Sequence, residues 1–280
     1  MSVYAQNLLR ELVALGHDVT MVSQFRGDAL GRGVYGGGPP PPVPGVRVVG
    51  LEAHGEQNGG RFEDDIQAII DTVERLHAAQ PFDLLHAQYG YPSGLAALRH
   101  AHGEYVALLD ADDVWLPTAL ARMAALLEAT PAAAFVGGNA LRWYSWTHDP
   151  ADAAMDYAPT IARFGLASPA LLPPPQLVHL LLQDPSASPP TCSVLLRRAW
   201  LTAVAGFVDS FRTLYEDQAL YAKLALRAPV LLTDEVWAHY RRHNDSACAQ
   251  MYGTAAEAES RQVFLDWLAA YAPELAERVK

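Results

Sequence analysis

The feature that most constrains this chain is an apolar run that ends abruptly in carboxylates. Residues 105–109 are all apolar or aromatic, and Asp110-Ala111-Asp112-Asp113 follow directly. Such a run predicts a buried strand, and open α/β sheets bind ligands in the crevice beyond the carboxyl ends of their strands. Asp110 and Asp112 are two residues apart, so on a continued strand both carboxylates face one side. The sequence therefore predicts an acidic pocket at this point.

Carboxylate oxygens in such a pocket are ligands that Mg²⁺ or Mn²⁺ prefers. A bound cation would carry the charge that develops on a departing diphosphate. The alternative is a turn in which an aspartate caps the following helix, which we expect from Pro117 to about Ala129. Three carboxylates among four residues favour the metal site.

Two further polar clusters follow predicted strands or open predicted helices. Tyr215-Glu216-Asp217 opens a helix expected to reach about residue 226. Acids there complement the helix macrodipole, and the alternative is that one carboxylate is a general base that deprotonates a sugar hydroxyl. The second cluster, residues 240–243, contains Arg241 and His243, which suit phosphate and metal respectively but are also common on a solvated face.

The remaining pattern predicts an α/β fold with a Rossmann-like, mostly parallel sheet. A helix over 3–15, Gly16 as its cap and a strand over 17–22 form half of a parallel α/β unit. We further expect helices over 62–79, 117–129, 198–204, 216–226 and from 255 onward, and strands over 46–49, 83–86, 105–109, 133–136, 191–196, 230–232 and 237–240. Residues 148–175 should form a surface excursion over the site. Gly36-Gly37-Gly38 leads into prolines rather than a helix, which favours a linker over a phosphate loop.

Composition excludes several classes of protein. The net charge of −11 argues against binding nucleic acid or an anionic membrane through a basic surface. The N-terminus has neither the basic region nor the apolar core of a signal peptide, and no apolar run reaches the roughly 18 residues that span a bilayer. Cys192 and Cys248 lack metal-ligand spacing, so we expect free thiols in a reducing compartment. We therefore expect a cytoplasmic protein, and peripheral contact with the inner face of a membrane is left open.

Several of these segments together resemble family-two glycosyltransferases, the inverting GT-A type. Residues 103–117, which include the acidic run, look like the metal-binding segment of that family. Residues 206–211 and 215–218 resemble its acceptor-side segment and catalytic-base motif, and residues 240–243 resemble its closing segment. The order and spacing agree across about residues 100–246, and several motifs in one order are more specific than any one alone.

The resemblance implies a role for each of the acidic and basic residues. Asp110 would contact the ribose of the donor, Asp112 would bind the metal, and Asp113 would support it. Asp217 would be the catalytic base, with Glu216 orienting the acceptor or the base. Arg241 would contact the donor, and His243 would complete the metal or phosphate site. The implied reaction moves a sugar from a nucleotide-diphosphate sugar to a saccharide or lipid-linked acceptor, with inversion and with Mn²⁺ or Mg²⁺.

The first part of the chain is similar to a different family. Residues 5–12 and 16–20 look like the N-terminal domain of family-four, GT-B type glycosyltransferases, and residues 82–87 are similar to a later strand there. We therefore expect a partial GT-B-like segment over 1–98 and a GT-A-like catalytic segment over 99–280.

Two alternatives to a glycosyltransferase stay open. The strand ending in Pro-x-Tyr-Asn and the acids that hold the nucleobase in family two do not precede Asp110. This absence leaves a noncatalytic, glycosyltransferase-derived binding or scaffold protein as the first alternative. Paired carboxylates also serve nucleotidyl transfer, the second alternative, which releases pyrophosphate.

Overall fold

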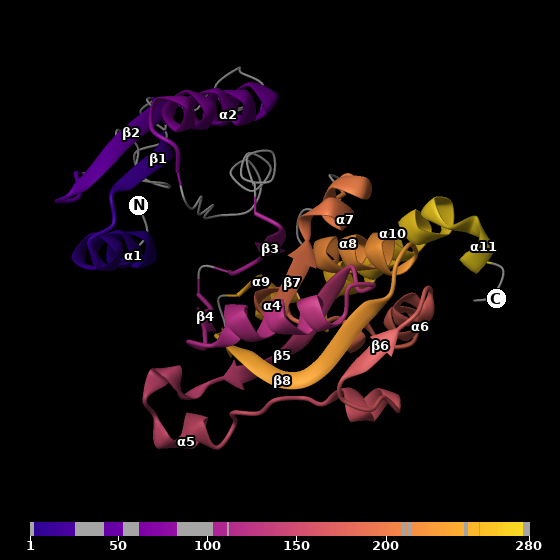
Figure 1. The fold of residues 1–280 in the computed structure, drawn as a ribbon. Coiled ribbons are helices and arrows are strands. Elements are labelled where there is room, and N and C mark those ends of the chain that lie inside the picture. The colour runs from indigo at the N-terminus through magenta and orange to yellow at the C-terminus, as the bar shows by residue number, and fades with distance from the viewer. Residues whose placement is uncertain are drawn as a thin grey trace. The chain divides into compact units, whose positions relative to one another are not determined.

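The chain folds into two compact units, Met1–His102 and Gly103–Lys280, drawn in Figure 1. The structure, a computed structural model, describes residues 3–25, 42–52, 62–82, 103–110, 112–208, 211, 214–243, 246–251 and 253–276. The strand predicted over 83–86 and the Gly36–Gly38 run lie outside these residues. None of the described helices has the length and apolarity needed to cross a membrane.

The N-terminal unit contains a two-stranded parallel sheet. Helix α1 (Val3–Ala14) leads into β1 (Val19–Phe25), which pairs in parallel with β2 (Val46–Glu52), and α2 (Phe62–Ala79) follows. Gly16 has φ +86°, so it ends α1 in the left-handed conformation that the sequence predicted.

The second unit is built on a sheet with strand order β3-β7-β5-β8-β4 and with β6 paired to β8. The strands are β3 (Tyr105–Ala107), β4 (Val114–Trp115), β5 (Phe135–Trp143), β6 (Ala170–Leu172), β7 (Val194–Arg197) and β8 (Val230–Arg241). The α/β class is confirmed. Parallel pairing holds for β1–β2 and β5–β8, whereas the four other pairs of the second sheet are antiparallel. Hydrophobic periodicity identifies a buried strand but carries no information on its direction.

Helices pack around this sheet. They are α4 (Ala119–Ala129), α5 (Pro150–Ala153), α6 (Gln176–Gln183), α7 (Arg198–Ala203), α8 (Glu216–Ala225), α9 (Ala247–Met251), α10 (Ala255–Tyr271) and α11 (Pro273–Ala276). Short 3-10 turns are η2 (Ser145–Thr147), η3 (Ile161–Phe164), η4 (Pro185–Ala187) and η5 (Thr191–Ser193). The strands predicted over 230–232 and 237–240 are one strand, β8, and the excursion over 148–175 contains β6, which the sequence did not predict.

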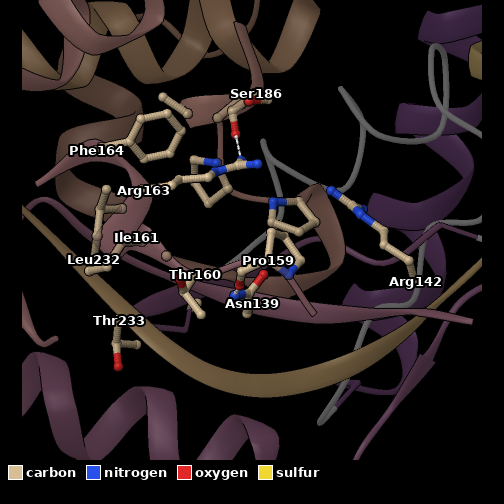
Figure 2. Close-up of a pocket in the computed structure, with 16 residues that line it drawn as sticks. Asn139, Arg142, Pro159, Thr160, Ile161, Arg163, Phe164, Ser186, Leu232 and Thr233 are labelled. Carbon is tan, nitrogen blue, oxygen red and sulfur yellow. Dashed lines mark hydrogen bonds between the residues drawn. The ribbon is translucent and has the colours of Figure 1, made fainter. Parts of the chain in front are cut away.

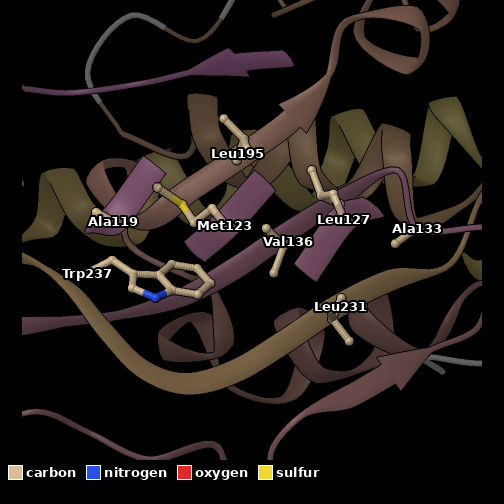
Figure 3. Close-up of a cluster of buried hydrophobic side chains, with 8 residues drawn as sticks. All are labelled: Ala119, Met123, Leu127, Ala133, Val136, Leu195, Leu231 and Trp237. Carbon is tan, nitrogen blue, oxygen red and sulfur yellow. The ribbon is translucent and has the colours of Figure 1, made fainter. Parts of the chain in front are cut away.

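Helix α4 supplies the apolar face that covers the sheet. Ala119, Met123 and Leu127 recur every four residues, so they form one stripe, and all three are buried. Figure 3 shows this stripe against side chains of β5, β7 and β8, among them Leu231 and Trp237. The packing fixes the part of β8 that leads toward the predicted site.

Strand β8 is long and bent, as Figure 1 shows, and its pairing with β5 is irregular at the bend. The register shifts between Gly137 and Asn139, and again between Asn139 and Ala140. At Gly138 a Cβ atom would lie 2.4 Å from the Trp237 ring and 2.8 Å from the backbone oxygen of Glu235. Glycine is therefore required for the close approach of the two strands at this point.

We predict that Gly138→Ala destabilises the protein by about 1–3 kcal/mol, because the buried Trp237 ring and the β8 backbone must move away from the added methyl group. Chemical denaturation measures the change in free energy of unfolding. Gly103→Ala is the matched control, since its Cβ would meet only a backbone oxygen of Tyr105 at 3.4 Å. Equal stabilities of the two variants would contradict the prediction.

Candidate active site

The acidic run lies in a turn rather than on a strand. Strand β3 ends at Ala107, and the backbone N–H of Asp113 donates to the carbonyl oxygen of Asp110 at 3.2 Å. The expectation that Asp110 and Asp112 alternate along a continued strand is therefore wrong. The capping alternative is also wrong for α4, because its N-cap residue is Thr118.

Asp113 is the buried member of the run, with 2% of its surface exposed. The backbone N–H of Arg241 donates to its Oδ1 at 2.9 Å, and the thiol of Cys192 donates to the same carboxylate. Burial, with smaller contributions from the charges of Asp110 and Asp112, raises the pKa of Asp113 to about 6 against the effect of these hydrogen bonds. Asp113 thus supports the turn from inside. Cys192 is a free thiol, as predicted, and the side chain of Cys248 lies outside the description.

The end of β8 holds Asp112 through its backbone and its side chain. Arg241 Nε donates to the carbonyl oxygen of Asp112 at 2.8 Å, and the Arg241 guanidinium lies over the rings of Trp143 and Trp146 at 4.9 and 5.0 Å. His243 Nε2 lies 3.0 Å from Asp112 Oδ2. The structure therefore brings together Asp112 and His243, the two side chains predicted to bind the metal.

The pair is smaller than a complete metal site. Among the described residues, no group of three or more potential ligands gathers. Mg²⁺ and Mn²⁺ sites in nucleotide enzymes nevertheless use few protein ligands and fill the shell with phosphate oxygens and water. One carboxylate and one imidazole side by side therefore fit a cation that arrives with a diphosphate.

The predicted base lies in the first turn of α8. Asp217 Oδ1 accepts from the backbone N–H of Gln218 at 2.7 Å, and Ser188 Oγ donates to Asp217 Oδ2 at 3.3 Å. Burial, and then the charge of Glu216, raises the pKa of Asp217 to about 7. A carboxylate with this pKa can accept a proton near neutral pH.

The two acidic clusters, the Asp110–Asp113 run and Glu216–Asp217, lie close enough for their charges to affect each other. The pKa of Asp110 is raised by desolvation first, then by the negative charge of Asp112 and then by that of Glu216. Asp110 from the turn after β3 and Glu216 from α8 therefore repel each other, although they are far apart in sequence. A bound cation would relieve this repulsion.

Buried polar atoms without a hydrogen-bond partner gather in the same region. Among the described residues they include Asp113 Oδ2, Glu216 Oε2, Gln218 Oε1 and the Tyr221 hydroxyl. All four belong to the acidic run or to α8. Buried polar atoms in native proteins almost always have a partner, so this cluster indicates a place where water or a ligand binds.

A pocket adjoins the base on the side of Ser188. It opens to solvent and is lined by 137–139 and Arg142 of β5, by 159–161, Arg163 and Phe164, by 186–190 and by Leu232 and Thr233 of β8. Figure 2 shows Asn139 and Thr160 below the side chain of Arg163, with Arg142 to the right.

Sequence reasoning missed the residues that surround the predicted ones. Ser188 lies in a proline-rich stretch and carries no motif, and Cys192 was interpreted only as a free thiol. Tyr221 is buried inside α8, and its hydroxyl is one sign of a polar site. Tyr221 follows Asp217 by four residues, about one helical turn, and this spacing is visible in the sequence.

The comparisons with known proteins concern glycosyltransferases. Residues 1–155 match the model of the glycosyl transferase 4-like domain, and no curated protein matches the sequence. Among solved structures, the crystal structure of S. aureus TarS 1–349 in complex with UDP-GlcNAc is 14% identical, with a TM-score of 0.40 over 84% of this chain and 62% of that chain. The crystal structure of S. aureus TarS 1–349 is 14% identical, with a TM-score of 0.36 over 70% of this chain and 51% of that chain. The crystal structure of S. aureus TarS is 13% identical, with a TM-score of 0.38 over 91% of this chain and 43% of that chain. The chain thus spans less than two thirds of each of these proteins.

The family match covers more than half of the 280 residues. It includes the N-terminal segment that was predicted to be family-four-like, and it continues through the acidic run and α5. The family-two resemblance of residues 100–246 stays a prediction. The chain belongs to the glycosyl transferase 4-like domain family.

Proposed function

We propose that this protein is a metal-assisted glycosyltransferase that moves a sugar from a nucleotide-diphosphate sugar to a saccharide or lipid-linked acceptor, with inversion. The observation that carries the proposal is the placement of Asp217, with a pKa of about 7, on a helix whose Glu216 shares one electrostatic field with Asp110 and Asp112. This reaction needs two parts, a base and an acidic turn that would hold the cation for the diphosphate. The family-two resemblance over 100–246 supports the same assignment.

On the donor side, Asp112 and His243 would hold Mn²⁺ or Mg²⁺, which supplies positive charge to the departing diphosphate. Arg241 already organises the turn through Asp112 and Asp113, and we assign it a second role in contacting the diphosphate. Asp110 is exposed beside this pair and would accept hydrogen bonds from the ribose.

On the acceptor side, the Asp217 carboxylate accepts the proton of an acceptor hydroxyl as that oxygen attacks the anomeric carbon. The bond between this carbon and the diphosphate oxygen breaks, and the nucleoside diphosphate leaves with the electron pair. A single displacement of this kind inverts the anomeric centre. Ser188 holds the Asp217 carboxylate in place, and Glu216 Oε2, buried without a partner, can accept from the acceptor.

One observation favours the noncatalytic alternative. Strand β3 is at the end of the strand order, and within the described residues no strand pairs with its outer edge. The strands that hold the nucleobase in family two would precede the acidic run and lie beside it. A binding protein that retains the sugar pocket without donor binding is therefore the second candidate.

The first prediction concerns donor binding. Wild-type protein should bind uridine or guanosine diphosphate in the presence of Mn²⁺ and lose this binding when Mn²⁺ is chelated, because Asp112 and His243 alone do not attract a diphosphate. Asp112→Ala should abolish the Mn²⁺-dependent part, and His243→Ala should weaken it at least about tenfold. Isothermal titration calorimetry measures both.

Asp266→Ala is the matched control, because this exposed aspartate of α10 accepts a hydrogen bond from the neighbouring Gln262 and should leave binding unchanged. Absence of Mn²⁺-dependent binding to every nucleoside diphosphate would favour the noncatalytic candidate. Release of pyrophosphate from a nucleoside triphosphate would instead indicate a nucleotidyltransferase.

The second prediction concerns the base. Asp217→Asn should lower sugar transfer by about 10²–10⁴-fold while Mn²⁺-dependent nucleotide binding stays within about twofold. In the wild type, kcat should rise with pH through about 7, because the base acts only when ionised. A wild-type rate that is constant between pH 5.5 and 8.5 would contradict the assignment.

The third prediction concerns stability. The folded-state pKa of Asp217 is about 7 and its ordinary value is 3.8, so the folded state favours the protonated carboxyl group. The free energy of unfolding should therefore fall by about 2–4 kcal/mol as the pH rises from about 4 to about 8. Asp217→Asn should remove most of this fall and should be more stable than the wild type at pH 8.

Denaturant titrations at a series of pH values measure this effect. Asp113, with a pKa of about 6, should leave a residual slope at lower pH in the Asp217→Asn variant. Asp266→Asn should follow the wild-type curve. A variant that is inactive, correctly folded and more stable at pH 8 distinguishes a desolvated base from a residue that only maintains the fold.

A further inference from the structure

The charged side chains that line the pocket beside Asp217 are all positive, whereas the whole chain is acidic. Of its sixteen lining residues, only Arg142 and Arg163 are charged, so no carboxylate lines it. The chain as a whole carries a net charge of −11. The lining therefore supplies only positive charge, while three carboxylates outside it, Asp184, Asp217 and Asp234, accept hydrogen bonds from the lining residues Ser186, Ser188 and Ile161.

The charge of Arg142 is less balanced by hydrogen-bond acceptors than the charge of Arg163. Its guanidinium carbon lies 4.6 Å from the centroid of the Tyr240 ring, and its backbone N–H donates to the Tyr157 carbonyl oxygen at 2.8 Å. Within the described part of the chain, its guanidinium forms no hydrogen bond and no ion pair. Stacking on an aromatic ring orients the group while its N–H donors stay available for a planar anion.

Arg163 is partly engaged. Its Nη2 donates to the Ser186 carbonyl oxygen at 2.7 Å, as the dashed line in Figure 2 shows, and its guanidinium lies over the Phe164 ring at 4.6 Å. Its charge also lowers the pKa of Asp184, so part of its field is balanced. Arg163 should therefore contribute less than Arg142 to the binding of an anion.

The pocket meets the predicted base at Ser188, which lines the pocket and also donates to Asp217 at 3.3 Å. A ligand in the pocket would therefore contact Ser188, whose hydroxyl contacts the Asp217 carboxylate. Pro159, Pro189 and Pro190 supply apolar walls of the kind that pack against the face of a sugar ring.

We propose that this pocket is the acceptor site and that it selects an acceptor carrying an anionic group, a phosphate or a carboxylate, bound chiefly by Arg142 with a smaller contribution from Arg163. The assignment of an acceptor rests on the proposed function, because only the role of Asp217 as the base makes an adjoining ligand a nucleophile. The anion selectivity itself rests on the pocket alone.

The test compares three hexoses that differ in charge and in the source of that charge. Glucose, glucuronate and glucose 6-phosphate are titrated into the full chain at low ionic strength, without nucleotide or metal, by calorimetry. We expect glucuronate or glucose 6-phosphate to bind at least tenfold more tightly than glucose, and the tighter of the two identifies carboxylate or phosphate as the preferred anion. Equal affinities for all three sugars would overturn the proposal.

Substitutions of the two arginines test where the anionic sugar binds. Arg142→Gln should weaken binding of the preferred anion at least tenfold, Arg163→Gln should weaken it less, and Arg142→Lys should retain part of the affinity because it keeps the charge. Arg122→Gln is the matched control, since Arg122 is exposed and paired with Glu235 at 2.8 Å, and it should bind as the wild type does. An Arg142→Gln variant that folds and binds within twofold of the wild type would refute the assignment.

A second measurement separates this inference from the proposed function. The preferred anionic sugar should accelerate release of nucleoside diphosphate from a nucleotide sugar, and Arg142→Gln should raise the KM for that sugar without changing Mn²⁺-dependent nucleotide binding. Normal nucleotide binding with no anion preference would refute the acceptor inference alone. Anion binding by a protein that never binds nucleotide would refute the proposed function and, with it, the acceptor role of the pocket.

Discussion

The site depends on the attachment of the acidic turn to the end of β8 through the buried carboxylate of Asp113. This carboxylate accepts hydrogen bonds from the backbone N–H of Arg241 and from the thiol of Cys192. The Arg241 side chain also donates to the backbone carbonyl oxygen of Asp112. The turn therefore cannot move independently of β8. Asp110, which is exposed, and Asp112, which is half-buried, therefore gain a fixed position from the buried Asp113. Removing Asp113 would free them, which is why a buried acid is retained despite its cost of desolvation.

Stability and the proposed function make opposite demands on Asp217, the proposed base. Asp217 lies where burial and Glu216 oppose its ionisation, and two hydrogen bonds only partly offset them. A neutral side chain there would suit the fold better, so the position is consistent with the proposed role of Asp217 as the base. The unpartnered oxygen of Glu216 and the hydroxyl of Tyr221 point to the same conclusion, since a region selected only for stability would satisfy or remove them.

The sequence predicted the elements with strong periodicity and the residues with a family pattern. Helix α2 begins and ends where its apolar stripe does, at Phe62 and Ala79, because amphipathic spacing and flanking polar residues both mark its ends. The same reasoning predicted two strands over 230–232 and 237–240, whereas residues 233–235 between them belong to the same strand, β8, where its pairing with β5 is irregular. Strand direction and the contact of Ser188 with Asp217 depend on tertiary packing, and no local pattern encodes either of them.

The pairing of β5 with β8 connects the two halves of the proposed reaction. Arg142 pairs with Tyr240 and stacks on its ring, whereas the next pair, Trp143 with Arg241, stacks on the opposite face because side chains alternate along a strand. One face thus carries Arg142 of the proposed acceptor pocket, and the other carries Arg241, which holds the acidic turn. The close approach of the strands at Gly138 sets the register for both, so a shift at the bend would displace the donor and acceptor groups together.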